Sequence, residues 1–280
     1  MTMISYAQNG EDVLLRRVFP DSYQGFYVDA GANDPIYHSV TKHFYEHGWR
    51  GVNIEPLPKM HARLTADRPR DVTLHAGLAD IEGVLTFHES ESIHGWSTFN
   101  SLMAADYKAL GHVLVERNVP VTTLQKVCDE YSPGQIDFLK IDVEGFEPAV
   151  LRGGDWTRHR PRVVLIENAW PETWEHLILE ANYLPAACDG INRYYVRAEE
   201  PSLLEAFRYP VNAADDYIAY GYHKLINDME ETIRELKAEL IAGHRYGPIA
   251  LSVARRFRRL SIRHPKLADT VKRLVWRRAS

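Results

Sequence analysis

Short apolar runs that end in acidic, amide or glycine residues recur along the chain and predict buried strands. Four of them are the clearest: Phe26–Asp29, Gly51–Glu55, Ile136–Asp142 and Val163–Glu167. A parallel strand that is covered on both faces is apolar throughout, and its C-terminal end lies at the edge of the sheet where ligands bind. We therefore expect these strands to form the centre of a sheet whose carboxyl ends carry the functional groups.

Segments with helical character separate the strands. We predict helices over Tyr6–Phe19, over Ser39–Gly48, from just after Pro58, and over Thr123–Tyr131, Glu147–Arg152 and Glu172–Asn182. Further strands are predicted over Val72–Leu78, Gly83–His88, Val119–Val121 and Tyr194–Arg197, with a polar loop over Glu89–Ser101. Strands that alternate with helices are typical of a parallel, doubly wound α/β sheet.

The pattern changes beyond Tyr222. Apolar residues recur there at steps of four and three, from Leu225 to Leu240, and predict a helix with one narrow apolar stripe. Glycine and proline then interrupt the pattern, and two shorter basic helices follow. We accordingly divide the chain into a domain over residues 1–221 and a helical, basic extension over residues 222–280.

Charge is distributed unevenly along the chain. Residues 250–280 hold ten Lys or Arg and one Asp, a net charge of +9, and because the whole chain carries −5, the remainder carries −14. A body that is so acidic excludes nucleic acid as the partner of the main domain. The basic extension instead predicts either a peripheral contact with anionic lipid, or packing on the acidic body or on a second copy of the chain through the apolar stripe.

Targeting segments are not evident. No run approaches the roughly 20 apolar residues of a membrane span, and the first ten residues lack the basic start and apolar core of a signal peptide. These features predict a cytoplasmic protein, associated with a membrane if the extension binds lipid.

The loops after the first two strands predict a nucleoside-type cofactor without phosphates. Asp29 ends the first strand and is predicted to contact the cofactor, Gly31 allows a tight turn and Asn33 opens the next helix. Glu55 ends the second strand, at roughly the ~20-residue offset where a carboxylate meets ribose hydroxyls. The diphosphate-binding glycine pattern is absent, and Asp34 makes the loop acidic. A sulfonium and an amino group suit such a loop, so we predict S-adenosylmethionine.

Several ordered motifs resemble the FkbM family of S-adenosylmethionine-dependent O-methyltransferases. They are SYAQNGED near the N-terminus, GFYVDAGAND, HSVTKHFYEHGWRGVNIEP and FLKIDVEGFE, and the resemblance extends from about Ser5 to about Tyr217. It implies a Rossmann-like methyltransferase sheet with an antiparallel strand near its end, and a hydroxyl acceptor, often on a sugar of a polysaccharide, glycolipid or macrolide. It also implies that Glu55 holds the ribose, that Gln8 belongs to the opening motif, and that Ala79 and Asp80 lie near the adenine.

The catalytic face is expected at the fourth and fifth strands. Asp142 and Glu144 follow one strand, and Glu167 and Asn168 end the other, so carboxylates and a carboxamide converge. Crowded carboxylates repel each other unless a cation or a proton lies between them. Oxygen ligands suit Mg²⁺ or Mn²⁺, with Asp142, Glu167 and Asn168 as the predicted ligands.

A general base is the alternative to a metal ion for activating the acceptor hydroxyl. His94, in a polar loop, is the first candidate and His38 the second. Trp96 and Tyr37 are candidates for stacking on a sugar ring, and Glu144 for contacting the acceptor. Two other functions stay open at this stage. One is a nicotinamide-dependent dehydrogenase, and the other is a non-catalytic assembly protein that acts through its C-terminal helices.

Overall fold

The computed structural model describes residues 2–91, 93–167 and 174–241, together with residues 252, 256 and 259. Contacts within the chain divide it into two compact units, 1–223 and 224–280. The first unit holds all the strands of the described residues and is the α/β body.

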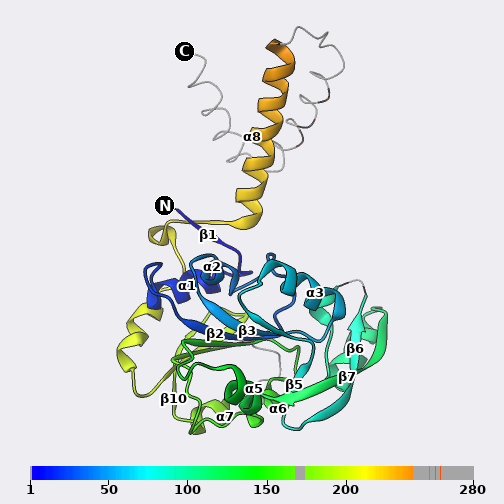
Figure 1. Ribbon diagram of the computed structural model, residues 1–280, viewed down its shortest axis with the longest axis vertical. Helices are drawn as coiled ribbons and strands as arrows, with labels where there is room; N and C mark the ends of the chain where they lie inside the picture. Colours follow the sequence, from blue (N-terminus) through cyan, green and yellow to red (C-terminus); the bar gives the residue numbers. More distant parts are fainter. Residues whose placement is uncertain are drawn as a thin grey trace. The chain divides into compact units, whose positions relative to one another are not determined.

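A seven-stranded sheet forms the centre of the α/β body (Figure 1). Its strand order is β10 (Tyr183–Cys188), β11 (Asn192–Arg197), β9 (Val163–Glu167), β8 (Phe138–Ile141), β2 (Phe26–Ala30), β3 (Arg50–Ile54) and β4 (Val72–Leu74). The five strands from β9 to β4 run parallel, and β11 is antiparallel to both β9 and β10. The predicted doubly wound sheet with an antiparallel strand near its end is thereby confirmed.

Helices cover both faces of this sheet and explain why its strands are apolar throughout. Alternate side chains of the strands enter two separate cores, as Leu139 and Ile141 do on one face and Phe138 on the other. The first core also takes side chains from α5 (Leu124–Tyr131), α6 (Glu147–Arg152) and α7 (Glu175–Glu180). The second takes them from α1 (Glu11–Val18), α2 (Lys42–Glu46) and the 3₁₀ segment η2 (Pro201–Phe207).

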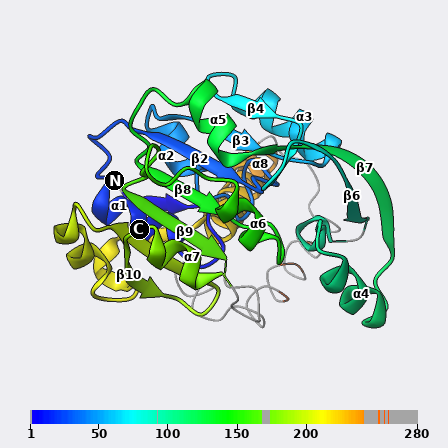
Figure 2. The same cartoon turned by 90° about the horizontal axis from the view of Figure 1, so that it is seen from below.

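The predicted strand Val72–Leu78 is wrong as a single strand, because it breaks into β4 and β5 (Gly77–Ala79). β5 leaves the main sheet and pairs with β7 (Leu114–Thr123), which also pairs with β6 (Gly83–Ser90) in a second, three-stranded sheet. Gly77 permits this departure, since a Cβ atom there would lie 2.4 Å from the ring of Phe99. β6 and β7 lie with α4 (Ser101–Ala109) at one side of the main sheet, on the right in Figure 2.

Several predicted boundaries also move. Helix α1 begins at Glu11 rather than Tyr6, because the buried Asp12 carboxylate accepts hydrogen bonds from the Ser5 hydroxyl and the Tyr6 amide and holds that segment outside the helix. Residues before it form β1 (Met3–Ser5), which pairs with β12 (Tyr217–Ala219). Helix α2 is shorter than predicted, and α3 (Pro58–Asp67) begins at the predicted proline. Strand β10 and helix α4 were not predicted, and η3 (Ala213–Asp215) completes the body.

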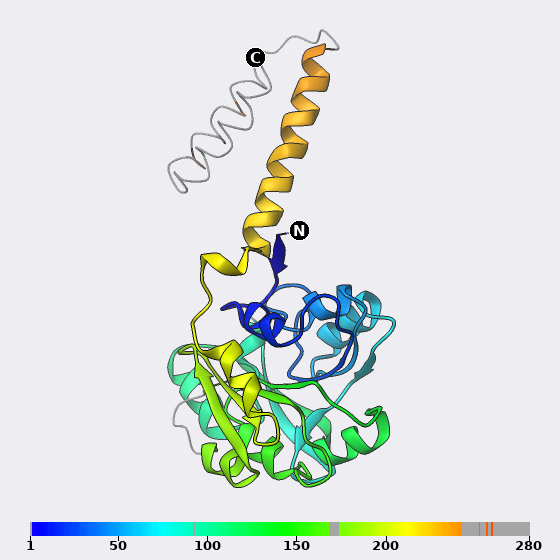
Figure 3. The ribbon, with the colours of Figure 1, turned by 90° about the vertical axis from the view of Figure 1, so that its left-hand side faces the viewer.

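The second unit is described through α8 (Tyr220–Ile241), which begins in the body and runs as one helix in Figure 3. Its apolar positions Leu225, Met229, Ile233 and Leu236 are all partly buried, whereas the residues between them are mostly exposed, as the predicted stripe requires. Of the two shorter basic helices predicted after it, the structure describes only residues 252, 256 and 259 of the first, each of them helical, and the second lies outside the described residues. Among the described helices, none is long and apolar enough to cross a membrane.

Candidate active site

A cavity of about 330 Å³ opens at the carboxyl ends of the central strands. It lies where the strand order reverses, between β2 and β8, which is the expected ligand position in a doubly wound sheet. Eleven predicted site residues line it: Gln8, Gly31, Asn33, Tyr37, His38, Glu55, His94, Trp96, Asp142, Glu144 and Glu167. Side chains from distant parts of the sequence therefore meet in one place.

Gly31 allows the loops after β2 and β8 to touch. Its φ of 80° is in the left-handed region, and a Cβ atom would lie 1.8 Å from the carbonyl oxygen of Asp142. No side chain fits there, so glycine is required for close backbone contact rather than for contact with a phosphate. The amide of Gly31 also donates to the carbonyl of Ile54, which joins this turn to the end of β3.

Glu55 connects the loops after β2 and β3. One carboxylate oxygen accepts a hydrogen bond from the Asn33 amide and the other from the Leu57 amide, both at 2.7 Å. Burial raises the pKa of Glu55 to about 7, although these two hydrogen bonds act in the opposite direction. Glu55 thus also fixes the start of α3, a structural role that the sequence did not indicate, while it lines the cavity.

Lys140 lies beneath the cavity, although it belongs to the otherwise apolar strand β8. Its ammonium group is 3.0 Å from Asp142, 3.5 Å from Asp29 and 3.1 Å from the carbonyl oxygen of Gly31. Burial lowers the pKa of Lys140, but the adjacent Asp142 and Asp29 carboxylates more than offset that effect, so the net shift is upward. The lysine therefore stays charged and is the counterion of both acids.

Asp29 itself does not line the cavity. The side chain is buried and accepts a hydrogen bond from the Thr41 hydroxyl at 2.8 Å, with Lys140 on its other side. It stabilises the base of the site rather than facing its opening. This placement differs from the predicted direct contact with the cofactor, because the strand end turns its carboxylate toward the buried lysine.

Ala79 and Asp80 also lie away from the cavity lining. Ala79 is buried, with its carbonyl against Gly153, and Asp80 forms an ion pair with Arg152 at the surface. A smaller hollow of about 50 Å³ lies beside the main cavity and is lined by the two preceding residues, Gly77 and Leu78. Ala79 and Asp80 are therefore not among the residues that line either hollow, and their contact with the adenine stays a prediction.

Three carboxylates converge at the ends of β8 and β9. Asp142, Glu144 and Glu167 each place one oxygen so that the three oxygens lie within 4.8 Å of one another. Burial is the main cause that raises the pKa values of both Glu144 and Glu167, and the negative charge of Asp142 is the second. A hard divalent cation or a shared proton would relieve this repulsion. Asn168, the third predicted metal ligand, lies outside the described residues.

Glu144 is held in an unusual conformation by neighbours that the sequence did not reveal. Its φ is 53°, which is rare for a residue other than glycine. The Thr98 hydroxyl donates to its carbonyl oxygen at 2.6 Å, and the Tyr107 hydroxyl donates to its carboxylate at 2.7 Å. Such strained residues concentrate at functional sites, where surrounding contacts maintain them.

The 3₁₀ segment η1 (His94–Trp96) forms one wall of the cavity. Nδ1 of His94 is buried without a hydrogen-bond partner among the described residues, and so is Oδ1 of Asn33. Unsatisfied buried polar atoms are costly, and their position here indicates that a ligand completes them. Trp96 is already stacked on Tyr107, with ring centroids 5.1 Å apart, which leaves only part of the indole for a sugar.

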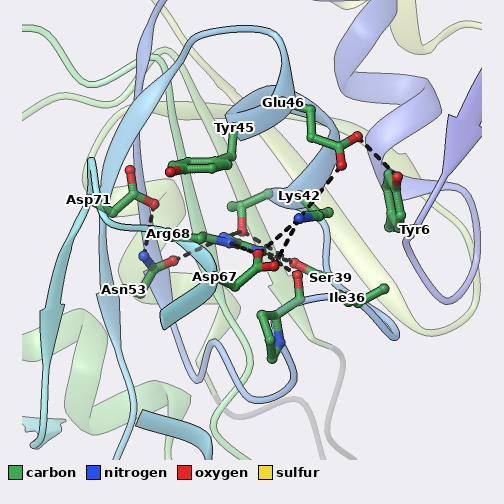
Figure 4. A network of polar contacts seen from close by, with 12 residues as sticks. Tyr6, Ile36, Ser39, Lys42, Tyr45, Glu46, Asn53, Asp67, Arg68 and Asp71 are labelled. Carbon is green, nitrogen blue, oxygen red and sulfur yellow. Dashed lines mark hydrogen bonds and ion pairs between the residues drawn. The ribbon is translucent and has the colours of Figure 1, made fainter. Parts of the chain in front are cut away.

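A buried arginine holds the loop that carries Tyr37 and His38 (Figure 4). Arg68 has no exposed surface, and its guanidinium group donates to the carbonyl of Pro35 at 2.9 Å and to the hydroxyl of Ser39 at 2.6 Å. It thereby grips the loop on both sides of these two residues.

The other contacts of Arg68 extend toward the base of the site. It donates to the Thr41 hydroxyl and to Oδ1 of Asn53, and Thr41 in turn donates to Asp29. The loop is also supported from outside, because the ring of Tyr37 packs edge-on against Tyr220, 5.3 Å between centroids. His38, in the same loop, has a φ of 60°, a conformation that surrounding contacts must maintain. Tyr37 and His38 therefore depend on the same set of contacts.

Three residues described above were not predicted from the sequence: Lys140, Tyr107 and Arg68. A lysine within the apolar run FLKI is a usable signal, since a buried lysine requires acidic partners. Tyr107 and Arg68 give no such signal, because each reaches the site through a tertiary contact from another element.

Comparison with known proteins identifies the family of the chain. The family model described as the methyltransferase FkbM domain matches residues 29–196, more than half of the chain. Among solved structures, the chain is similar to a TehB-like SAM-dependent methyltransferase from Corynebacterium glutamicum ATCC 13032 Kitasato. That match has 11% identity and a TM-score of 0.37, and it covers 68% of this chain and 88% of the other. No curated protein matches the chain. On the extent of the family match, the chain belongs to the FkbM family of S-adenosylmethionine-dependent methyltransferases.

Proposed function

We propose that the protein transfers the methyl group of S-adenosylmethionine to a hydroxyl group of a sugar in a polysaccharide, glycolipid or glycosylated natural product. The observation that carries the proposal is that Glu55 and the carboxylates of Asp142, Glu144 and Glu167 line the same cavity. Glu55 suits a nucleoside cofactor, and the other three carboxylates suit the activation of a hydroxyl.

The residues present fit the cofactor. Glu55 offers a buried carboxylate for the ribose, Asn33 and His94 offer unsatisfied polar atoms, and the acidic lining suits a positively charged donor. Gly77 and Leu78 line the adjoining hollow, where we place the adenine. When bound, S-adenosylmethionine supplies an activated methyl group for in-line displacement.

The chain must then align the acceptor oxygen and accept its proton. The cluster of Asp142, Glu144 and Glu167 supports two ways to do this. A divalent cation such as Mg²⁺ or Mn²⁺, held by Asp142, Glu167 and Asn168 with Glu144 nearby, would lower the pKa of the hydroxyl. Without the ion, one carboxylate or His94 would take the proton. His38 is the second candidate base.

A neutral, polyhydroxylated acceptor agrees with the lining of the cavity. Its acidic residues would repel phosphate or carboxylate groups on an acceptor, and Tyr37 and Trp96 supply aromatic surface at the cavity. Glu144, fixed by Tyr107, is placed to accept a hydrogen bond from an acceptor hydroxyl.

The basic extension supports a further part of the proposal. We place the enzyme at a surface rich in anionic lipid, where a lipid-linked glycan would be presented, with α8 as the alternative contact for a second copy of the chain. The net charge of +9 over residues 250–280 supports the first and the apolar stripe of α8 the second. The acidic main domain is proposed to bind no nucleic acid.

The test is methyl transfer from labelled S-adenosylmethionine to a panel of neutral glycans and glycolipids, followed by identification of the methylated atom. Label in an ether linkage, lost in the Asp142→Asn variant, supports O-methylation at this cavity. Label on a nitrogen or carbon atom would overturn the choice of acceptor but not the choice of donor.

A further inference from the structure

A second group of potential metal-binding side chains lies at helix α2, outside the cavity lining. Asp21, in the loop between α1 and β2, lies beside His43 in α2 and His47 at the end of that helix. One potential ligand atom from each residue lies within 4.8 Å of the other two. None of the three lines the cavity.

The two histidines have the spacing that places side chains on the same face of a helix. Their ring centroids are 4.2 Å apart, and Nε2 of His43 is 3.1 Å from a carboxylate oxygen of Asp21. Ligand atoms around a tetrahedral zinc ion, at about 2.0–2.2 Å from the metal, are separated by comparable distances. Small side-chain rotations would therefore close the set around one ion.

His47 is prepared for such an ion by its own hydrogen bond. Nδ1 lies 2.8 Å from the carbonyl oxygen of His43, and because a carbonyl only accepts, Nδ1 carries the proton. Nε2 is then left with its lone pair, the usual arrangement of a histidine that binds a metal.

From this geometry we infer that Asp21, His43 and His47 form a zinc site, with water as the fourth ligand. Two imidazoles and one carboxylate suit a borderline metal such as zinc better than Mg²⁺, which prefers oxygen ligands alone. Binding requires His43 to exchange the Nε2 proton that now faces Asp21 for one on Nδ1, so that both imidazoles present lone pairs. Asp21 is exposed and His47 partly so, which gives the ion a route of entry.

Arg16 limits the affinity of this site. Its guanidinium group donates to both carboxylate oxygens of Asp21, each at 2.8 Å, and its positive charge opposes that of the ion. Arg16 is not a ligand, but removing its charge should free Asp21 and strengthen zinc binding.

The experiment is zinc titration by calorimetry on protein without an affinity tag, in excess magnesium to occupy sites made of oxygen ligands. We expect one zinc ion per chain and an unfolding temperature that rises with zinc concentration. His47→Gln and Asp21→Asn should weaken zinc binding by about tenfold or more, and Arg16→Gln should strengthen it. His75→Gln is the matched control, because His75 and His61 form another histidine pair that, among the described residues, belongs to no cluster with a carboxylate.

Each of the four variants has an outcome that would contradict the proposed site. If zinc binds to His47→Gln or Asp21→Asn as tightly as to the parent, the site is wrong. It is also wrong if His75→Gln loses as much affinity as His47→Gln, or if Arg16→Gln fails to bind more tightly. The unfolding temperature of each variant without zinc shows whether its fold is intact. Cobalt substitution adds a readout, since a tetrahedral site gives strong visible absorption that His47→Gln should lose.

Discussion

The ammonium group of Lys140 lies 3.0 Å from a carboxylate oxygen of Asp142, directly beneath the cavity. The same group faces Asp29 at 3.5 Å, so one buried cation balances acids from two neighbouring strands.

Removing the charge of Lys140 would leave two acids without a counterion. We expect Lys140→Met to lower the free energy of unfolding by about 3–5 kcal/mol, the usual cost of breaking a buried ion pair. Denaturant unfolding measures the loss, and Arg152→Met, which breaks only a surface pair with Asp80, is the control. Equal, small losses in both variants would contradict this role of Lys140.

Glu55 gives a prediction about the donor. If its carboxylate accepts hydrogen bonds from the ribose, Glu55→Ala should weaken S-adenosylmethionine binding by about 2–4 kcal/mol. Calorimetry with the cofactor alone provides the measurement. Glu55→Gln keeps the volume and one acceptor, so it should lose less affinity than Glu55→Ala. Binding within twofold of the parent in Glu55→Ala would remove Glu55 from the cofactor site.

The buried acids predict how stability depends on pH. Burial raises the pKa values of Glu55, Glu147 and Asp12 to about 7, above their ordinary values near 4, so between these limits the folded state binds more protons than the unfolded state. The free energy of unfolding without ligand should therefore fall as pH rises from about 4.5 to about 7. Thermal unfolding across this range tests the sign. Glu55→Gln should show a shallower fall, and a stability that rises over the range would contradict the prediction.

The acidic cluster predicts the effect of metal removal. If a divalent ion bridges Asp142 and Glu167, chelation should abolish methyl transfer without releasing the cofactor, and Mg²⁺ or Mn²⁺ should restore it. Full activity after exhaustive chelation would leave proton transfer by a side chain. In that case His94→Asn should lower kcat by about 10²-fold or more, as expected for a general base. His38→Asn, at the second candidate base, is the matched comparison.

Arg68 is predicted to act as a positioning residue for the loop that carries Tyr37 and His38. Arg68→Lys retains the charge but not the two-sided grip on Pro35 and Ser39. We expect it to raise the KM for the acceptor more than the dissociation constant of S-adenosylmethionine, because Glu55 is held by other contacts. Steady-state kinetics and cofactor calorimetry, on variant protein shown to be folded, separate the two effects. Equal weakening of both ligands would indicate a general loss of structure.

The basic extension is tested by sedimentation with phosphatidylglycerol vesicles. Binding that falls with salt and disappears when the chain is truncated after Tyr222 would support contact with lipid. If the intact chain stays in the supernatant at low salt while truncation changes its oligomeric state, the extension assembles copies of the chain instead.

The central strands and the helices between them could be predicted because burial on both faces imposes a continuous apolar run, as in Val163–Glu167. The residues at the ends of these strands could be predicted for the same reason, since each run ends abruptly in polar residues. Val72–Leu78 failed because the apolar pattern does not show that a strand leaves its sheet. Tyr107 and Arg68 escaped notice because their roles depend on hydrogen bonds to Glu144 and Ser39, far away in the sequence.

The cavity is lined by separate parts of the sequence, one of which lies in the excursion between strands β6 and β7 of the second sheet, where α4 begins. The half of the cavity that suits the donor is built by the turns after β2 and β3, where Gly31 allows no side chain. Another part of the lining, residues 93–97, comes from the excursion of the chain over residues 93–107, which reaches Glu144 through Thr98 and Tyr107. We expect that exchanging residues 93–107 for the corresponding segment of another family member would change the preference for the acceptor more than the affinity for S-adenosylmethionine.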